Sequence, residues 1–108
     1  MLLSLPAKTL WRYEGFYASV IYAYLASLGM EVHAEDTTNH GRIDLTLRYD
    51  GATFIFEFKV DGKGAMEQLK GMGYHEKYMA DSKAITLIAM EFSSQERNIV
   101  NIEWERIK

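Results

Sequence analysis

Residues 41–60 read GRIDLTLRYDGATFIFEFKV, and the pattern of this segment is the basis for the predicted fold. At its centre, Asp50-Gly51 is a strong signal for a two-residue turn between antiparallel strands. On both sides of the turn, apolar residues recur at every second position, which is typical of β-strands. The stretch therefore predicts a hairpin formed by strands Arg42–Tyr49 and Ala52–Val60.

Alternation along the two strands separates an apolar face from a polar one. The predicted apolar face consists of Ile43, Leu45, Leu47, Phe54, Phe56, Phe58 and Val60. On the opposite face the first strand presents Arg42, Asp44, Thr46 and Arg48, and the second presents Ile55, Glu57 and Lys59. We therefore expect Asp44, Glu57 and Lys59 to project from one surface.

The turn also predicts a register. Counting outward from Asp50-Gly51 places Asp44 opposite Glu57, with Cβ atoms about 5 Å apart. Two carboxylates at this distance repel unless a positive charge lies between them, and Mg²⁺ prefers such oxygen ligands. Lys59 would then lie beside the metal, where its ammonium could orient a water molecule or meet charge on phosphate. Two alternatives remain open: Asp44 and Glu57 are ordinary solvent-facing residues, or a bulge at the turn shifts the register by one residue.

Further elements flank the hairpin, and together they predict an α/β fold, a mixed β-sheet flanked by helices. With 108 residues, the chain has the size of one domain. Hydrophobic spacing and glycine positions predict helices Thr9–Leu28 and Gly62–Ala80, and strands Glu31–Asp36, Ala84–Phe92 and Ile99–Ile107.

The first predicted helix is apolar on several sides. Its core-facing stripe would be Leu10, Tyr17, Ile21, Tyr24 and Leu28. Because Phe16, Val20, Ala23 and Leu25 make the other faces nearly as apolar, we expect a partner surface, for a second copy of the chain or for a neighbouring domain. In the last strand, Val100, Ile102 and Trp104 alternate with polar residues, which predicts one buried and one wet face.

Composition narrows the class of protein. The chain contains no cysteine, which excludes a disulfide framework and fits a cytoplasmic location. We expect no membrane association, since the N-terminal stretch lacks the basic residues of a signal peptide and the uncharged stretch 15–30 is too short to span. A net charge of -3 provides no general electrostatic attraction for nucleic acid, so phosphate binding would depend on local groups or a metal.

For several other candidate site residues, the sequence allows both a functional and a structural interpretation. Glu14 occupies a gap in the apolar stripe of the first helix, so it either faces inward or pairs with a nearby cation at the exposed helix start. Gln68 either reaches the polar face of the hairpin or is a surface glutamine. The lysines Lys63, Lys70 and Lys77 form a seven-residue repeat that is either a phosphate-contacting ridge or, as we favour, a solvated face. The histidines His33, His40 and His75 lack zinc-site spacing, and His40 is interpreted as a loop residue.

These residues together resemble the PD-(D/E)XK nucleases. The resemblance rests on Glu14, Gly41-Arg42-Ile43-Asp44, Glu57-Phe58-Lys59 and Gln68, and extends over about Trp11 to Trp104. More narrowly, the motifs are similar to those of the C-terminal nuclease domain of bacterial proteins that also carry an AAA-ATPase-like domain. In two respects the chain departs from the pattern: Ile43 replaces the signature proline, and Tyr74 does not follow Gln68 at the four-residue spacing of some members.

The resemblance implies a restriction-endonuclease-like αβββαβ core and metal-dependent hydrolysis of phosphodiester bonds. It implies Mg²⁺ or Mn²⁺ as cofactor, with Asp44, Glu57, the backbone carbonyl of Phe58 and, as a further candidate, Glu14 as ligands. Lys59 would lie beside the attacking water, and Gln68 would support the site. The chain would be a single domain, 1–108, and could be the C-terminal part of a larger protein.

Two functions follow as alternatives. The first is a nuclease, with DNA as the expected substrate. The second is a catalytically silent module with the same fold that serves protein assembly through helix 10–28. The complete set of Asp44, Glu57 and Lys59 favours the nuclease.

Overall fold

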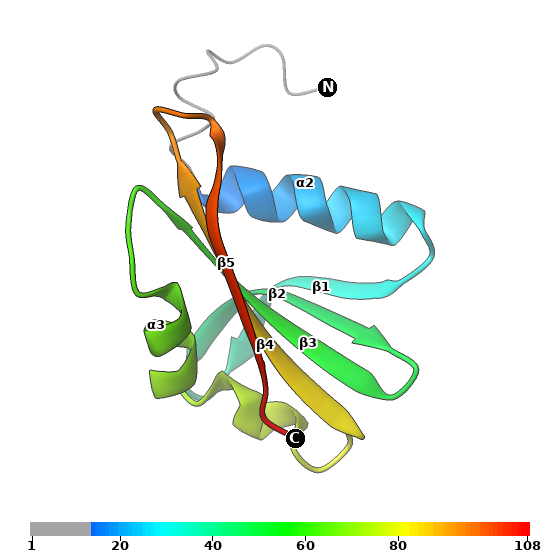
Figure 1. The fold of residues 1–108 in the computed structure, drawn as a ribbon. Coiled ribbons are helices and arrows are strands. Elements are labelled where there is room, and N and C mark those ends of the chain that lie inside the picture. The colour runs from blue at the N-terminus through cyan, green and yellow to red at the C-terminus, as the bar shows by residue number, and fades with distance from the viewer. Residues whose placement is uncertain (1–13) are drawn as a thin grey trace.

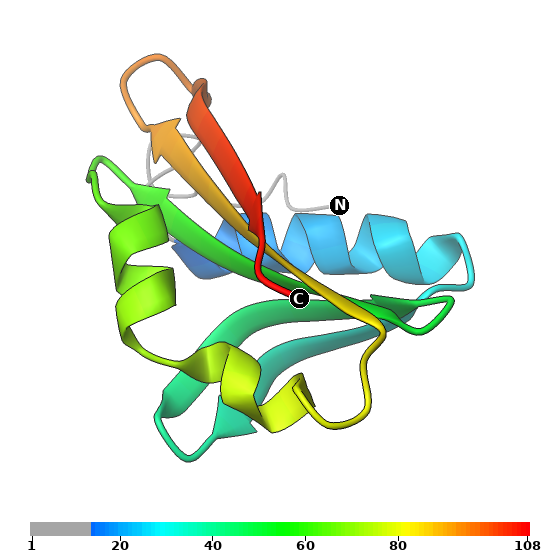
Figure 2. The same ribbon diagram turned by 60° about the horizontal axis from the view of Figure 1, so that its bottom comes forward.

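The computed structural model describes the backbone of residues 14–108 and the side chains of residues 18–108. A five-stranded sheet with strand order β1-β2-β3-β4-β5 forms the centre of the molecule. Helix α2 lies on one face of the sheet, and helix α3 with the short 3-10 helix η1 lies on the other (Figures 1 and 2). The predicted α/β class, a mixed sheet flanked by helices, is confirmed.

The strands are β1 (Glu31–Thr38), β2 (Gly41–Tyr49), β3 (Ala52–Val60), β4 (Ala84–Ser93) and β5 (Asn98–Arg106). Pairing is antiparallel except between β3 and β4, which are parallel and are connected through α3 and η1. Each strand contains the segment predicted for it, apart from Ile107 at the end of β5, and the bounds differ by at most two residues.

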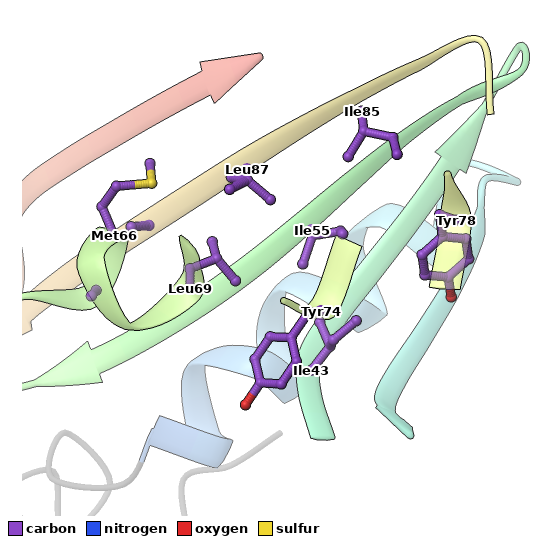
Figure 3. Close-up of a cluster of buried hydrophobic side chains, with 10 residues drawn as sticks. Ile43, Ile55, Met66, Leu69, Tyr74, Tyr78, Ile85 and Leu87 are labelled. Carbon is purple, nitrogen blue, oxygen red and sulfur yellow. The ribbon is translucent and has the colours of Figure 1, made fainter. Parts of the chain in front are cut away.

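Each face of the sheet has its own core. On the α2 face, a cluster around Leu45, Phe56, Phe58 and Phe92 packs against Ala18, Ile21 and Leu25 of the helix. On the opposite face, side chains of the central strands pack beneath α3 and η1, as Figure 3 shows; this cluster includes Ile43, Ile55, Leu69, Tyr74, Tyr78, Ile85 and Leu87. The polar face that we predicted for the hairpin is therefore covered by helices along much of its length.

The predicted helix Gly62–Ala80 is wrong as one continuous element. It is divided into α3 (Ala65–Gly71) and η1 (Tyr74–Tyr78). Gly73 between them has a φ of 68°, in the left-handed region that glycine adopts without steric cost, and this turn ends the regular helix. The seven-residue lysine repeat consequently forms no ridge: Lys63 precedes α3, Lys70 pairs with Glu105, and Lys77 pairs with Asp36.

Helix α2 (Glu14–Ser27) buries a stripe that matches the predicted one at Ile21 but not at Tyr24 and Leu28. Its described core contacts come from Ala18, Ile21 and Leu25, whereas Tyr24 is 65% exposed and Leu28 is 55% exposed. The start of the predicted helix at Thr9, and the predicted positions of Leu10 and Tyr17, lie outside the described side chains. Within residues 14–108, no helix is long and apolar enough to cross a membrane.

The prediction of one buried face for the last strand is also wrong. Trp104 is 72% exposed, and Val100 and Ile102 are exposed as well. The reason is the position of β5 at the edge of the sheet, because α2 lies mainly over β1, β2 and β3. No element of residues 14–108 buries the apolar side chains of β5.

A polar cluster fixes η1 against β1 and β2. The Asp36 carboxylate accepts hydrogen bonds from Thr46 Oγ1 at 3.0 Å, from the Tyr78 hydroxyl and from Lys77 Nζ. Burial alone would raise the pKa of Asp36, but these hydrogen bonds, led by that from Lys77, hold the pKa below its ordinary value. Burial and the bond to Asp36 raise the pKa of Tyr78, so its hydroxyl remains a donor at neutral pH.

Candidate active site

The hairpin has the register that the turn predicted. Asp50 and Gly51 have φ angles of 50° and 81°, as a two-residue turn of this kind requires, and Tyr49 pairs with Ala52. The same register continues without a bulge to Leu45 and Phe56, where the ladder between β2 and β3 ends. The next positions in this register are Asp44 and Glu57. The two carboxylates therefore lie where the strands stop pairing.

At Asp44 the side-chain alternation of β2 breaks, and this corrects the predicted apolar face. Leu45 belongs to the core on the α2 face, but Ile43 belongs to the core under α3 and η1. On the neighbouring strand, Glu35 has a φ of 51° at the point opposite Asp44. At this irregular position the Asp44 carboxylate turns toward β3, where its Oδ2 accepts a hydrogen bond from the Phe58 N–H at 2.8 Å.

Glu57, Lys59 and Gln68 form a hydrogen-bonded row beside Asp44. Glu57 is only 7% exposed, and its Oε2 accepts a bond from Gln68 Nε2 at 3.3 Å. The other end of the same amide, Gln68 Oε1, accepts a bond from Lys59 Nζ at 2.7 Å. Gln68 thus lies between the Glu57 carboxylate and the Lys59 ammonium. Of the two interpretations of Gln68, the one in which it reaches the hairpin is confirmed.

Tyr74 is not assigned to this site from the sequence, because its spacing from Gln68 differs from that of some superfamily members. It is 5% exposed, and a Cβ added at Gly41, the first residue of β2, would lie 3.4 Å from its hydroxyl oxygen. Burial raises the pKa of Tyr74, and the negative charges of Glu57 and Asp44 raise it further. The hydroxyl is therefore protonated at neutral pH, and its pKa responds to the charge of both carboxylates. The signal that could have identified it is Gly73, which breaks the helix and redirects the next side chain.

The structure places two of the histidines in surface contacts and leaves the orientation of the Glu14 side chain untested. His40 lies in the β1–β2 turn, as predicted, and its Nε2 is 3.3 Å from Glu76 Oε1. His33 contacts Glu31 at 3.2 Å. Glu14 is the first residue of α2, but its side chain lies outside the described residues. Its inward or outward orientation therefore stays a prediction.

The donor set suits a hard divalent cation. Asp44 and Glu57 offer carboxylate oxygens, the ligands that Mg²⁺ and Mn²⁺ prefer. In an extended strand, the N–H and C=O of one residue point to the same side. Because the Phe58 N–H reaches Asp44, the Phe58 carbonyl is directed toward the same edge of β3. Within the described side chains, no three His, Cys, Asp or Glu residues are grouped to hold a metal, so a site here would need backbone or water oxygens, or Glu14, in addition.

Comparison with known proteins covers the part of the chain that contains these site residues. The family model of the PD-(D/E)XK nuclease superfamily matches residues 12–102. Over 100 residues, the chain is 45% identical to an uncharacterized protein in the vnfD 5′ region of Azotobacter chroococcum mcd 1. This match covers 89% of the chain but 19% of the relative, so the chain spans about a fifth of the relative's length.

Proposed function

The chain belongs to the PD-(D/E)XK nuclease superfamily, as its motifs predicted, and we propose that it is a Mg²⁺- or Mn²⁺-dependent nuclease that hydrolyses phosphodiester bonds of DNA. Nucleases of this superfamily generally use divalent metals. The observation that carries the proposal is the junction where β2 and β3 stop pairing, since it brings together Asp44, Glu57 and, through Gln68, Lys59.

In the proposed site, Asp44, Glu57 and the Phe58 carbonyl would hold the metal, with Glu14 as a further candidate ligand. A bound divalent ion would supply Lewis acidity at phosphate and lower the pKa of a bound water. Water attacks phosphorus, the bond to one ester oxygen breaks, and that oxygen leaves with a proton. The products are a phosphate monoester and a free hydroxyl group.

Lys59 and Gln68 act together in this proposal. Lys59 and Glu57 are two residues apart on one face of β3, where an ammonium and a carboxylate would pair directly. The Gln68 amide satisfies both groups and keeps them apart, with its oxygen toward Lys59 and its nitrogen toward Glu57. Glu57 can then bind metal while the Lys59 ammonium faces the developing negative charge on phosphate.

Tyr74 adds a neutral donor to the proposed site. Its hydroxyl is protonated across the neutral range, since the ordinary tyrosine pKa of about 10 is raised further here, so it can donate a hydrogen bond without adding charge to the site. A non-bridging oxygen of the scissile phosphate is the acceptor that we propose for it. The spacing between Gln68 and Tyr74 differs from that of some superfamily members, but Gln68 bonds Glu57 and the charges of Glu57 and Asp44 raise the pKa of Tyr74.

The test is cleavage of single- and double-stranded DNA and RNA by the wild type and by Lys59→Ala, with Mg²⁺, with Mn²⁺ and with EDTA. We expect metal-dependent cleavage of DNA and a loss of about 100-fold or more in Lys59→Ala. Lys63→Ala is the matched control, since it removes an exposed ammonium just outside the site and should retain activity. Equal cleavage by the wild type and Lys59→Ala would refute the role of Lys59 and would point to a contaminating nuclease.

We also propose that the exposed apolar surface of α2 and of the turn that follows it is an assembly surface. Val20, Tyr24 and Leu28 are 38%, 65% and 55% exposed, although large apolar side chains gain free energy from burial. A second copy of the chain or a neighbouring ATPase-like domain could cover them. Sedimentation of the wild type and Tyr24→Glu would test self-association: a monomer at all concentrations excludes the second copy and leaves the neighbouring domain.

A further inference from the structure

The short helix α3 cannot keep its position by itself. It has seven residues, and helices of this length are unstable without tertiary contacts. It begins after Gly64, which is in the left-handed conformation and provides no side-chain cap. Yet α3 carries Gln68, whose amide has to meet both Glu57 and Lys59. The start of α3 therefore needs an anchor from elsewhere in the fold.

Glu91 of β4 is that anchor. Its Oε2 accepts a hydrogen bond from the N–H of Ala65, the first residue of α3, at 3.2 Å. Its Oε1 accepts a bond from Asn101 Nδ2 of β5, also at 3.2 Å. Glu91 is 8% exposed and Ala65 is fully buried. A buried carboxylate at a helix start satisfies an unpaired N–H and is favoured by the positive end of the helix dipole.

The register of the sheet ties this anchor to the candidate active site. On the parallel ladder between β3 and β4, Glu91 is the direct partner of Lys59. Ala65 and Gln68 are three residues apart in α3, so they lie on the same side of the helix. Glu91 therefore lies beside Lys59 in the sheet and also contacts the start of α3. The same helix carries Gln68, which accepts the hydrogen bond from Lys59.

We propose that Glu91 is a positioning residue of the candidate active site: by holding the start of α3 on β4, it sets the place of the Gln68 amide between Glu57 and Lys59. The proposal rests on the proposed nuclease function for its kinetic consequence, but its structural consequence does not depend on activity. Glu91 acts through Ala65 and Gln68 and does not itself touch substrate.

Three variants separate positioning from general stability. Glu91→Ala removes the acceptor for the Ala65 N–H, whereas Glu91→Gln keeps an acceptor oxygen of the same reach. Glu105→Ala is the control, because it removes the carboxylate that binds Lys70 of the same helix without touching the helix start. If Glu91→Ala does not fold, Glu91→Asp replaces it, since the shorter side chain draws the oxygen away from Ala65.

The kinetic result expected at a temperature where every variant is folded is a kcat about 10- to 100-fold lower in Glu91→Ala, with KM changed less than about twofold. Glu91→Gln should recover most of the loss, and Glu105→Ala should resemble the wild type. A wild-type kcat in Glu91→Ala, or an equal loss in Glu105→Ala, would overturn the proposal.

A second measurement keeps this proposal separable from the proposed function. In nuclear magnetic resonance spectra, the Gln68 side-chain amide signals should move toward those of an unbonded glutamine in Glu91→Ala, and should stay in place in Glu91→Gln and Glu105→Ala. If the wild type cleaves no nucleic acid, the proposed function fails while these signals still decide the role of Glu91. Unchanged Gln68 signals in Glu91→Ala would overturn it.

Discussion

Replacing Asp44 by asparagine and by alanine separates the two roles that the structure gives this carboxylate. Asp44 accepts the Phe58 N–H at 2.8 Å, and it occupies the register position opposite Glu57. Asparagine can keep the hydrogen bond while it removes the charge, whereas alanine loses both. We therefore expect the two variants to change the stability of the metal-free protein in different ways.

The magnitudes follow from the geometry. At the separation of about 5 Å expected for residues opposed across two strands, two carboxylates would repel by about 3 kcal/mol at an effective dielectric constant of about 20. Solvent and the nearby Lys59 would reduce this to about 1 kcal/mol. Asp44→Asn should therefore leave the metal-free protein as stable as the wild type, or up to about 1 kcal/mol more stable. In Asp44→Ala, the amide of the fully buried Phe58 loses its acceptor, which costs about 1–3 kcal/mol relative to Asp44→Asn.

Urea unfolding in EDTA and in Mn²⁺ measures both effects. At a Mn²⁺ concentration about 100-fold above its Kd, the wild type should gain about 2.7 kcal/mol, and neither Asp44 variant should gain a comparable amount. Glu103→Gln, which removes an exposed carboxylate from β5, should respond to Mn²⁺ like the wild type. The reasoning is wrong if Asp44→Asn is as unstable as Asp44→Ala without metal, or if Mn²⁺ stabilises Asp44→Asn as much as the wild type.

Three further perturbations test other parts of the site and fold. Gln68→Ala should let Lys59 pair directly with Glu57, so we expect weaker stabilisation by Mn²⁺ in thermal melting and about 10-fold or slower cleavage in a single-turnover assay. Tyr74→Phe should keep its packing and lose its hydroxyl, which should lower kcat about 10-fold while urea unfolding changes by about 1 kcal/mol or less. Burial raises the pKa of Asp36, but its hydrogen bonds outweigh burial and lower the pKa. The ionised Asp36 therefore stabilises the folded protein fully above about pH 4, and this stabilisation is lost as the pH falls through the folded pKa. Thermal melts between about pH 3 and 6, which include the range where Asp titrates, should therefore show a smaller acid-induced loss of stability in Asp36→Asn than in the wild type.

Much of the fold could be predicted because local signals agreed with one another. The Asp50-Gly51 turn fixed a register that reaches the candidate site, and the strand alternation identified Ile55, Glu57 and Lys59 as one face. These features depend on residues close together in the chain, where turn geometry and a two-residue period determine the structure. The Asp36 cluster could not be found in this way, since Thr46 and Tyr78 approach Asp36 from distant parts of the sequence.

Two of the failures, at Gly73 and at Asp44, share a physical cause, which is a local change of backbone direction, whereas the failure at β5 has a different cause. At Gly73 a left-handed conformation ends the helix, and the next side chain, Tyr74, packs in the core beside Gly41 instead of following the helical period. At the edge, β5 has a strand pattern but no described neighbour over its apolar face, because periodicity predicts which residues share a face and not whether that face is covered.

The break at Asp44 matters most for the proposed chemistry. A regular strand would place Ile43 and Leu45 in one core and point Asp44 away from the sheet. Instead, the two apolar neighbours pack on opposite faces, and Asp44 turns along the sheet to the Phe58 amide. The same departure that made the predicted apolar face wrong brings the carboxylate to the edge where the Phe58 carbonyl lies. An irregular position with both neighbours fully buried is held by two cores at once, so the irregularity belongs to the site and is not a defect of the strand.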